Sequence, residues 1–197
     1  MPVPVPVPEN RPRLSSKELL ALLKPFKKKL APYEVILVGI RGYYKKTMGD
    51  PNINDIGIYD DAIFIYSPSA FAAFNANTDP TVKRRKTPTL RGIATLQPGF
   101  WPVYKFDNHI GKKTKYPAIC QRLGPVVVSR DGETELDKGE FGINIHKGAL
   151  GSTSSEGCQT IHPNQWESFY ELAKDQAVRY YGAEWKKTVI PYVLLEG

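Results

Sequence analysis

A histidine and a cysteine near the C-terminal end of the chain have the types and spacing that nucleophilic catalysis needs. His146 precedes Cys158 by 12 residues, and the residues between them are mostly small. A cysteine nucleophile needs a base within about 2.6–3.2 Å and donors for the developing oxyanion. His146 would be the base, and the turn that Gly157 allows would present the N–H groups of Gly157 and Cys158. The spacing alone is also compatible with a strand-end histidine and a loop thiol that never meet.

The second cysteine, Cys120, lies beside apolar, strand-like residues and is predicted to behave as a small hydrophobe. Two cysteines cannot make a disulfide framework. Four residues are of types that bind metal ions and could be considered as one set of ligands: Cys158, His162, His109 and His146. No CxxC or HxxxH pairing joins them, so we predict no metal site, and nothing points to another cofactor.

The N-terminal part of the chain predicts a leader and a helix. Residues 1–13 begin with alternating proline and read as a flexible or polyproline-II leader, and residues 14–197 as a single catalytic domain. The helix should begin at Ser15 or the next residue, because Ser15 and Glu18 fit a capping box. Pro25 should kink or divide this helix.

Most of the remaining chain predicts short strands. Apolar or β-branched runs favour strands within residues 34–40, 55–66, 92–96, 101–106, 118–121, 125–130, 141–146 and 189–195. The segment 70–77 is ambiguous, and 79–90 reads as a basic surface loop. Within 141–146, alternation directs Asn144 and His146 away from the core face. A helix should follow the cysteine from Trp166, so the fold class is α+β, mostly β.

The residues around the pair resemble a known family. The His … Ser/Thr-His-Gly-Cys signature of the YkuD-like L,D-transpeptidase catalytic domain is similar to Ile145-His146-x-Gly148 followed by Ser155-x-Gly157-Cys158. The resemblance is specific over about 141–162 and extends over roughly 33–195. Residues 39–44 and 54–61 look like a divergent phage and bacterial branch. The resemblance implies a β-sandwich or barrel fold with an N-terminal helix and a helix after the catalytic cysteine.

The resemblance also implies roles for individual residues. Cys158 would be the acyl-accepting nucleophile and His146 the base. The backbone carbonyl of Lys147 would orient the imidazole, and the backbone of Gly157 and Cys158 would bind the oxyanion. Family members attack the L,D-configured bond after meso-diaminopimelate in peptidoglycan stem peptides, and an amine or water then resolves the thioester.

The chain departs from the family pattern at two positions. Glu156 stands where the family usually has histidine, and Thr160 where it commonly has arginine or asparagine. Arg41 or Arg130 would then have to bind the substrate carboxylate. The remaining expected substrate-binding residues are Asn144, Gly148, Ser155 and Glu156.

Together these features predict a peptidoglycan-active cysteine enzyme that is hydrolytic, an L,D-carboxypeptidase or endopeptidase resembling a phage lysin or a secreted effector. The net charge of +7 suits an anionic envelope, and no motif indicates nucleic-acid binding. No signal peptide or transmembrane run is recognisable, so delivery to the periplasm or cell wall by a holin or a secretion system is expected. The alternatives are a catalytically inactive wall-binding or virion module of the same fold and, from charge alone, a nucleic-acid-binding protein.

Overall fold

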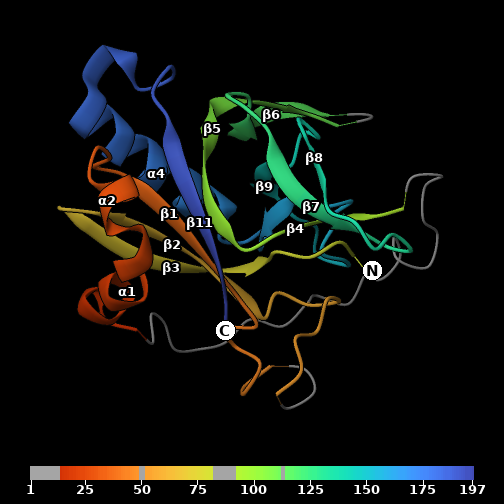
Figure 1. Cartoon of the computed structure of the whole chain (residues 1–197). Helices are drawn as coiled ribbons and strands as arrows, with labels where there is room; N and C mark the ends of the chain where they lie inside the picture. Colours follow the sequence, from red (N-terminus) through yellow and green to blue (C-terminus); the bar gives the residue numbers. More distant parts are fainter. Residues whose placement is uncertain (1–13, 49–51, 82–91, 112–113) are drawn as a thin grey trace.

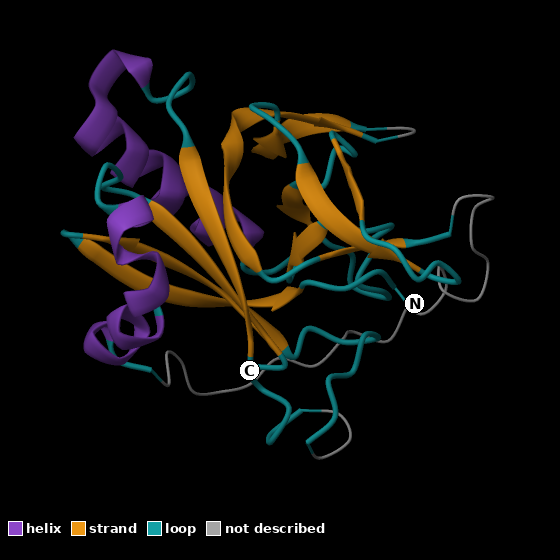
Figure 2. Cartoon of the chain, viewed as in Figure 1, coloured by secondary structure: helices purple, strands orange, loops and turns teal. Residues whose placement is uncertain are grey.

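The computed structural model describes residues 14–48, 52–81, 92–111 and 114–197. The described part is α+β and mostly strands, as the sequence predicts (Figure 2). Its helices are α1 (Ser16–Leu22), η1 (Lys24–Phe26), α2 (Lys27–Leu30), α4 (Trp166–Tyr181) and η2 (Gly182–Glu184). Its strands are β1 (Ile36–Arg41), β2 (Asp61–Ser67), β3 (Ala70–Asn77), β4 (Ala94–Leu96), β5 (Gly99–Ile110), β6 (Lys115–Gln121), β7 (Val126–Arg130), β8 (Asp137–Gly139), β9 (Ile145–Lys147), β10 (Gln159–Ile161) and β11 (Ile190–Glu196). The predicted leader, residues 1–13, lies outside the described residues.

In the described residues, eight strands close into a barrel in the order β1-β11-β5-β6-β9-β10-β3-β2 (Figure 1). Two of its pairings are parallel. The pairing of β1 with β11 joins the two ends of the fold, and that of β9 with β10 joins the strands that flank the His–Cys loop. Strands β4, β7 and β8 form a separate antiparallel sheet.

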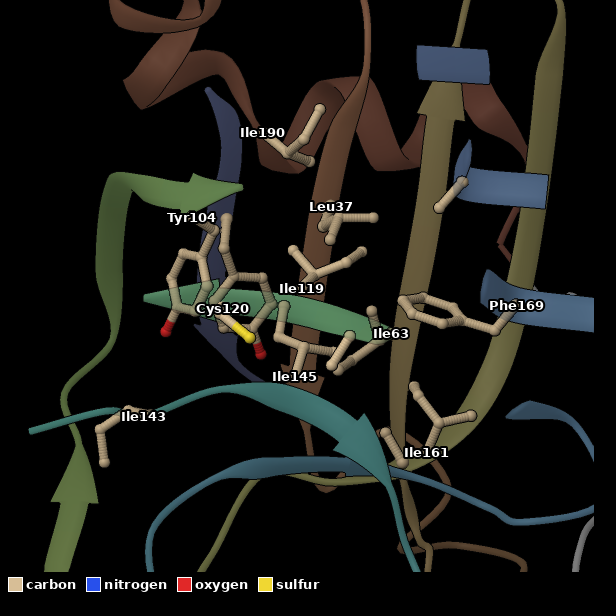
Figure 3. Close-up of a cluster of buried hydrophobic side chains, with 14 of the residues drawn as sticks. Leu37, Ile63, Tyr104, Ile119, Cys120, Ile143, Ile145, Ile161, Phe169 and Ile190 are labelled. Carbon is tan, nitrogen blue, oxygen red and sulfur yellow. The ribbon is translucent and has the colours of Figure 1, made fainter. Parts of the chain in front are cut away.

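Alternating side chains of β1 and β2 separate two hydrophobic cores. Leu37 and Ile63 belong to one cluster, which also contains Phe169 of α4 (Figure 3). Their neighbours Val38 and Phe64 point the other way and belong to a second cluster that includes buried residues of α1 and α2. Because successive side chains of a strand face opposite sides, α4 and the N-terminal helices cover opposite faces of this part of the barrel.

The N-terminal helix begins and divides where the sequence predicts. The Ser15 hydroxyl accepts the Glu18 N–H at 3.3 Å, and the Glu18 carboxylate accepts the Ser15 N–H at 2.7 Å, which completes the capping box. Pro25 lies in η1, between α1 and α2. The predicted second helix also begins at Trp166, and Gly182 ends it. No helix in the described ranges is long and apolar enough to cross a membrane.

The sequence does not predict strands β8 and β10, and two further segments also differ from the prediction. The ambiguous segment 70–77 is the regular strand β3. The strand predicted over 141–146 is wrong for its first four residues, since β9 begins only at Ile145. Side chains, and not a neighbouring strand, accept the backbone hydrogen bonds there. The Ile143 N–H donates to the Gln121 side chain, and the Asn144 N–H donates to the Cys158 sulfur.

Candidate active site

His146 lies in β9, and a neighbouring carbonyl fixes the orientation of its ring. Its Nδ1 lies 2.8 Å from the Lys147 carbonyl oxygen, which can only accept, so Nδ1 carries the proton. The Tyr116 hydroxyl approaches both groups, at 3.2 Å from Nδ1 and 3.3 Å from the carbonyl oxygen. Nε2 is therefore the unprotonated nitrogen, as a general base requires. The contact expected of Lys147 is present, and its part in catalysis stays a prediction.

Cys158 lies directly before β10, the strand next to the one that carries His146. The parallel ladder pairs His146 with Thr160, two residues after the cysteine. The Asn144 N–H donates to the Cys158 sulfur at 3.4 Å, and the thiol donates to the Gly142 carbonyl at 3.5 Å. No hydrogen bond within the described part of the chain joins Cys158 to His146. The fold thus places His146 in β9 and Cys158 just before the neighbouring strand β10, with no direct hydrogen bond between them.

Burial keeps both members of the pair uncharged at neutral pH. It raises the pKa of Cys158 to about 11, with a smaller rise from the nearby Glu156 and an opposing effect of the Asn144 N–H. Burial also lowers the pKa of His146 to about 4, and the neighbouring His109 lowers it further, against the Lys147 carbonyl. The resting state is therefore a neutral thiol and a neutral imidazole, with no thiolate–imidazolium pair.

The raised pKa of Cys158 predicts slow alkylation at neutral pH. Iodoacetamide reacts with the thiolate, so the rate should rise about tenfold per pH unit above pH 7 and level off near the pKa of about 11. Mass spectrometry of samples alkylated at a series of pH values measures this rate. Cys158→Ala identifies the site, and Cys120→Ala removes the other thiol, whose pKa burial raises to about 12. A rate that levels off below pH 8 would contradict a neutral resting thiol.

A second histidine, which sequence reasoning considered only as a metal ligand, packs against His146. The rings of His109 and His146 are stacked, with centroids 4.1 Å apart and an interplanar angle of 25°. His109 pairs across the β5–β6 hairpin with Tyr116, which contacts His146. The register of the β5–β6 hairpin places His109 opposite Tyr116. No local signal in the sequence predicts that β6 pairs with β9. That pairing brings them to the site.

Asn144 links the cysteine to this second histidine. Its Oδ1 accepts the Gln121 N–H at 3.1 Å, so its Nδ2 donates to His109 Nδ1 at 3.1 Å. Neutral His109 therefore carries its proton on Nε2, and burial and the charge of Arg122 lower its pKa. Asn144 was expected to bind substrate. Both ends of its amide are instead used within the protein, which favours a positioning role.

The turn before Cys158 leaves one amide for an oxyanion. The Gly157 N–H donates to the Ser155 hydroxyl at 3.0 Å, and that hydroxyl donates to the Cys158 carbonyl at 2.6 Å. Ser155 is buried and builds the turn. The Cys158 N–H has no hydrogen-bond partner among the described residues. Of the two predicted donors, Cys158 N–H is the one available in this conformation.

Gly157 is predicted to be intolerant of a side chain. Its φ is +136°, and an added Cβ would lie 2.7 Å from the Ala94 carbonyl oxygen. Gly157→Ala should lower the free energy of unfolding in urea by about 2–5 kcal/mol, from backbone strain and the clash together. Gly132→Ala is the control, because Gly132 also has a positive φ (+87°) but nothing lies within 4 Å of its Cβ position. Equal losses in the two variants would contradict this account of the turn.

Side chains from outside the loop hold the segment between His146 and Cys158 in place. The Tyr59 hydroxyl donates to the Ala149 carbonyl at 2.8 Å, and a Cβ at Gly148 would collide with that hydroxyl. Thr160, at the position where the family commonly has arginine or asparagine, donates to the Thr153 carbonyl at 2.8 Å. Gly148 and Thr160 thus shape the loop, and nothing here assigns them a substrate contact.

The two arginines expected to bind a carboxylate have partners within the chain. Arg41 is buried, pairs with Asp79 at 3.3 Å and Glu196 at 2.8 Å, and also donates to the Leu96 carbonyl. This network argues against Arg41 as a substrate ligand, because binding would require breaking a buried ion pair. Arg130 pairs with Asp137 at 2.8 Å. Glu156 is exposed beside the cysteine turn.

Comparisons with known proteins add no assignment to this site. No protein-family model matches the chain, and no curated protein matches it. Within the described ranges, no group of three or more histidine, cysteine, aspartate or glutamate side chains could hold a metal ion. Inference about function therefore depends on the geometry around Cys158 and His146 and on the resemblance of the residues between them.

Proposed function

We propose that the chain is a cell-wall cysteine enzyme with an L,D-transpeptidase-like fold, which cleaves peptidoglycan stem peptides by acyl transfer to Cys158. The observation that carries the proposal is the hydrogen bond from His146 Nδ1 to the Lys147 carbonyl. It leaves Nε2 as a base on the strand next to the cysteine. The motif from residues 145 to 158 supports the substrate class, and the net charge of +7 favours an anionic envelope.

The proposed reaction begins from the neutral pair. As the sulfur attacks the carbonyl carbon, the thiol proton passes to His146 Nε2 and the oxyanion accepts a hydrogen bond from the Cys158 N–H. The attack requires a rotation of the Cys158 side chain, since the resting thiol donates to Gly142. His146 then gives the proton to the leaving amine, which breaks the C–N bond and leaves a thioester. Water then attacks the thioester and gives a proton to His146, which passes it to the sulfur as the C–S bond breaks, so that the acid leaves and the Cys158 thiol is restored.

A second candidate function is a non-catalytic wall-binding module of the same fold. It is favoured by the absence of a Cys158–His146 hydrogen bond in the described structure and by the raised pKa of the thiol, about 11. Against it, catalytic hydrogen bonds in unliganded enzymes often form only when substrate is bound.

Digestion of purified sacculi separates the two candidates. Mass spectrometry should detect stem peptides shortened or cut by the wild-type protein, and no such products with Cys158→Ala. Co-sedimentation with sacculi that is equal for both proteins, without any products from either, would replace the enzyme proposal with the binding module.

A further inference from the structure

A groove of about 530 Å³ opens between the N-terminal helices and the start of β1. Along the chain, η1, which contains Pro25, separates α1 from α2, the two N-terminal helices labelled in Figure 1. None of its lining residues belongs to the candidate active site. The lining residues are Lys17, Leu20, Ala21, Leu23, Lys24, Lys27, Leu30, Ala31, Tyr33 and Ile36.

The floor of the groove suits an alkyl chain. Leu23, Leu30 and Ile36 are buried, and they come from the turn after α1, from α2 and from β1. Leu20 extends this apolar surface to the solvent, where it is 42% exposed. The volume lies within the range of about 300–1,000 Å³ that is typical of small-molecule sites. Burial of one alkyl chain there would remove its apolar surface and that of Leu20 from water.

The charged residues that line the groove are all basic. Lys17, Lys24 and Lys27 line it, and none of its lining residues is acidic. None of these three lysines has an ion pair with the part of the chain that the structure describes. Elsewhere on the surface, Lys174 and Lys187 each pair with a glutamate three residues away. Unpaired cations around an apolar floor are complementary to a negative head group on an alkyl chain.

We propose that this groove binds a single-chain amphiphile with an anionic head group, a carboxylate or a phosphate monoester. The alkyl chain would lie on Leu23, Leu30 and Ile36, and the head group would face Lys24 and Lys27. The site does not depend on the proposed wall activity, because it shares no residue with the His–Cys pair.

Isothermal titration of the full chain with dodecyl phosphate, below its micelle concentration, tests the proposal. We expect saturable one-to-one binding, and none with dodecyl maltoside or dodecyltrimethylammonium, which have the same chain and a neutral or cationic head. Lys24→Gln/Lys27→Gln should weaken binding about five- to thirtyfold. The control Lys28→Gln/Lys29→Gln removes the same charge from α2, at positions that do not line the groove, and should bind as wild type. Ala21→Trp, at an exposed lining position, should block the groove.

Four results would overturn the proposal. The first two are equal affinity for all three head groups and equal weakening of binding by both lysine pairs. The third is binding to anionic vesicles without binding to monomeric dodecyl phosphate. The fourth is self-association of the chain that accounts for the heat measured in the titration. Thermal unfolding of each variant confirms that it is folded before it is compared.

Discussion

Cys158→Ala is expected to reduce the proposed cleavage of stem peptides by at least about 10³-fold, because in the proposed reaction the acyl group is carried on the Cys158 sulfur. The rate of product formation from purified muropeptides, followed by chromatography and mass spectrometry, measures the effect. Thermal unfolding should be nearly unchanged, because the substitution removes only the sulfur atom, whose two hydrogen bonds are long, at 3.4 and 3.5 Å.

Cys120→Ala is the matched control for the loss of a thiol. Cys120 is fully buried among Tyr104, Ile119 and Ile145 (Figure 3), so its replacement should cost stability and leave the rate per folded molecule unchanged. A rate that falls with Cys120→Ala and survives Cys158→Ala would show that Cys120, and not Cys158, is the nucleophile.

His146→Gln is expected to lower the rate of thioester formation by about 10²–10⁴-fold, the usual contribution of a general base. The variant keeps a side-chain amide that can still donate to the Lys147 carbonyl, so the loss reflects the missing base. Single-turnover measurements at pH 7 would detect it. A decrease of less than tenfold would show that His146 does not accept the thiol proton.

The pH dependence of the wild-type rate gives an independent check on His146. Its pKa is about 4, so the base is neutral and competent above that pH and is lost by protonation only as the pH falls through about 4. Because His109 lowers this pKa, His109→Gln should move the acidic limb of the profile to higher pH. An acidic limb near pH 6.5 in the wild type would contradict the buried, neutral imidazole.

Local patterns in the sequence predict much of this fold. The capping box at Ser15, the break at Pro25 and the helix from Trp166 all lie where short-range rules place them. The error over residues 141–144 has a long-range cause. The side chain of Gln121 and the sulfur of Cys158 satisfy two backbone N–H groups there, and no pattern within the segment records those partners.

The candidate site, like the fold, is predicted only where it depends on residues that are close in sequence. His146, Lys147 and Cys158 are close in sequence, so their local motif indicates the arrangement. His109 reaches the site only because the β5–β6 hairpin pairs with β9, a contact between distant segments. Arg41 illustrates the opposite case. Its charge suggested that it could bind a substrate carboxylate, whereas in the fold it forms ion pairs with Asp79 and Glu196.

The most direct test of the account is the mass of the intact protein during turnover. The wild-type chain is mixed with a purified tetrapeptide stem and quenched in acid at intervals from milliseconds to seconds. We predict a transient increase equal to the acyl fragment, which peptide mapping assigns to Cys158 and which Cys158→Ala lacks. Release of cleaved stem peptide by Cys158→Ala at the wild-type rate, or an acyl group on any other residue, would contradict the central claim.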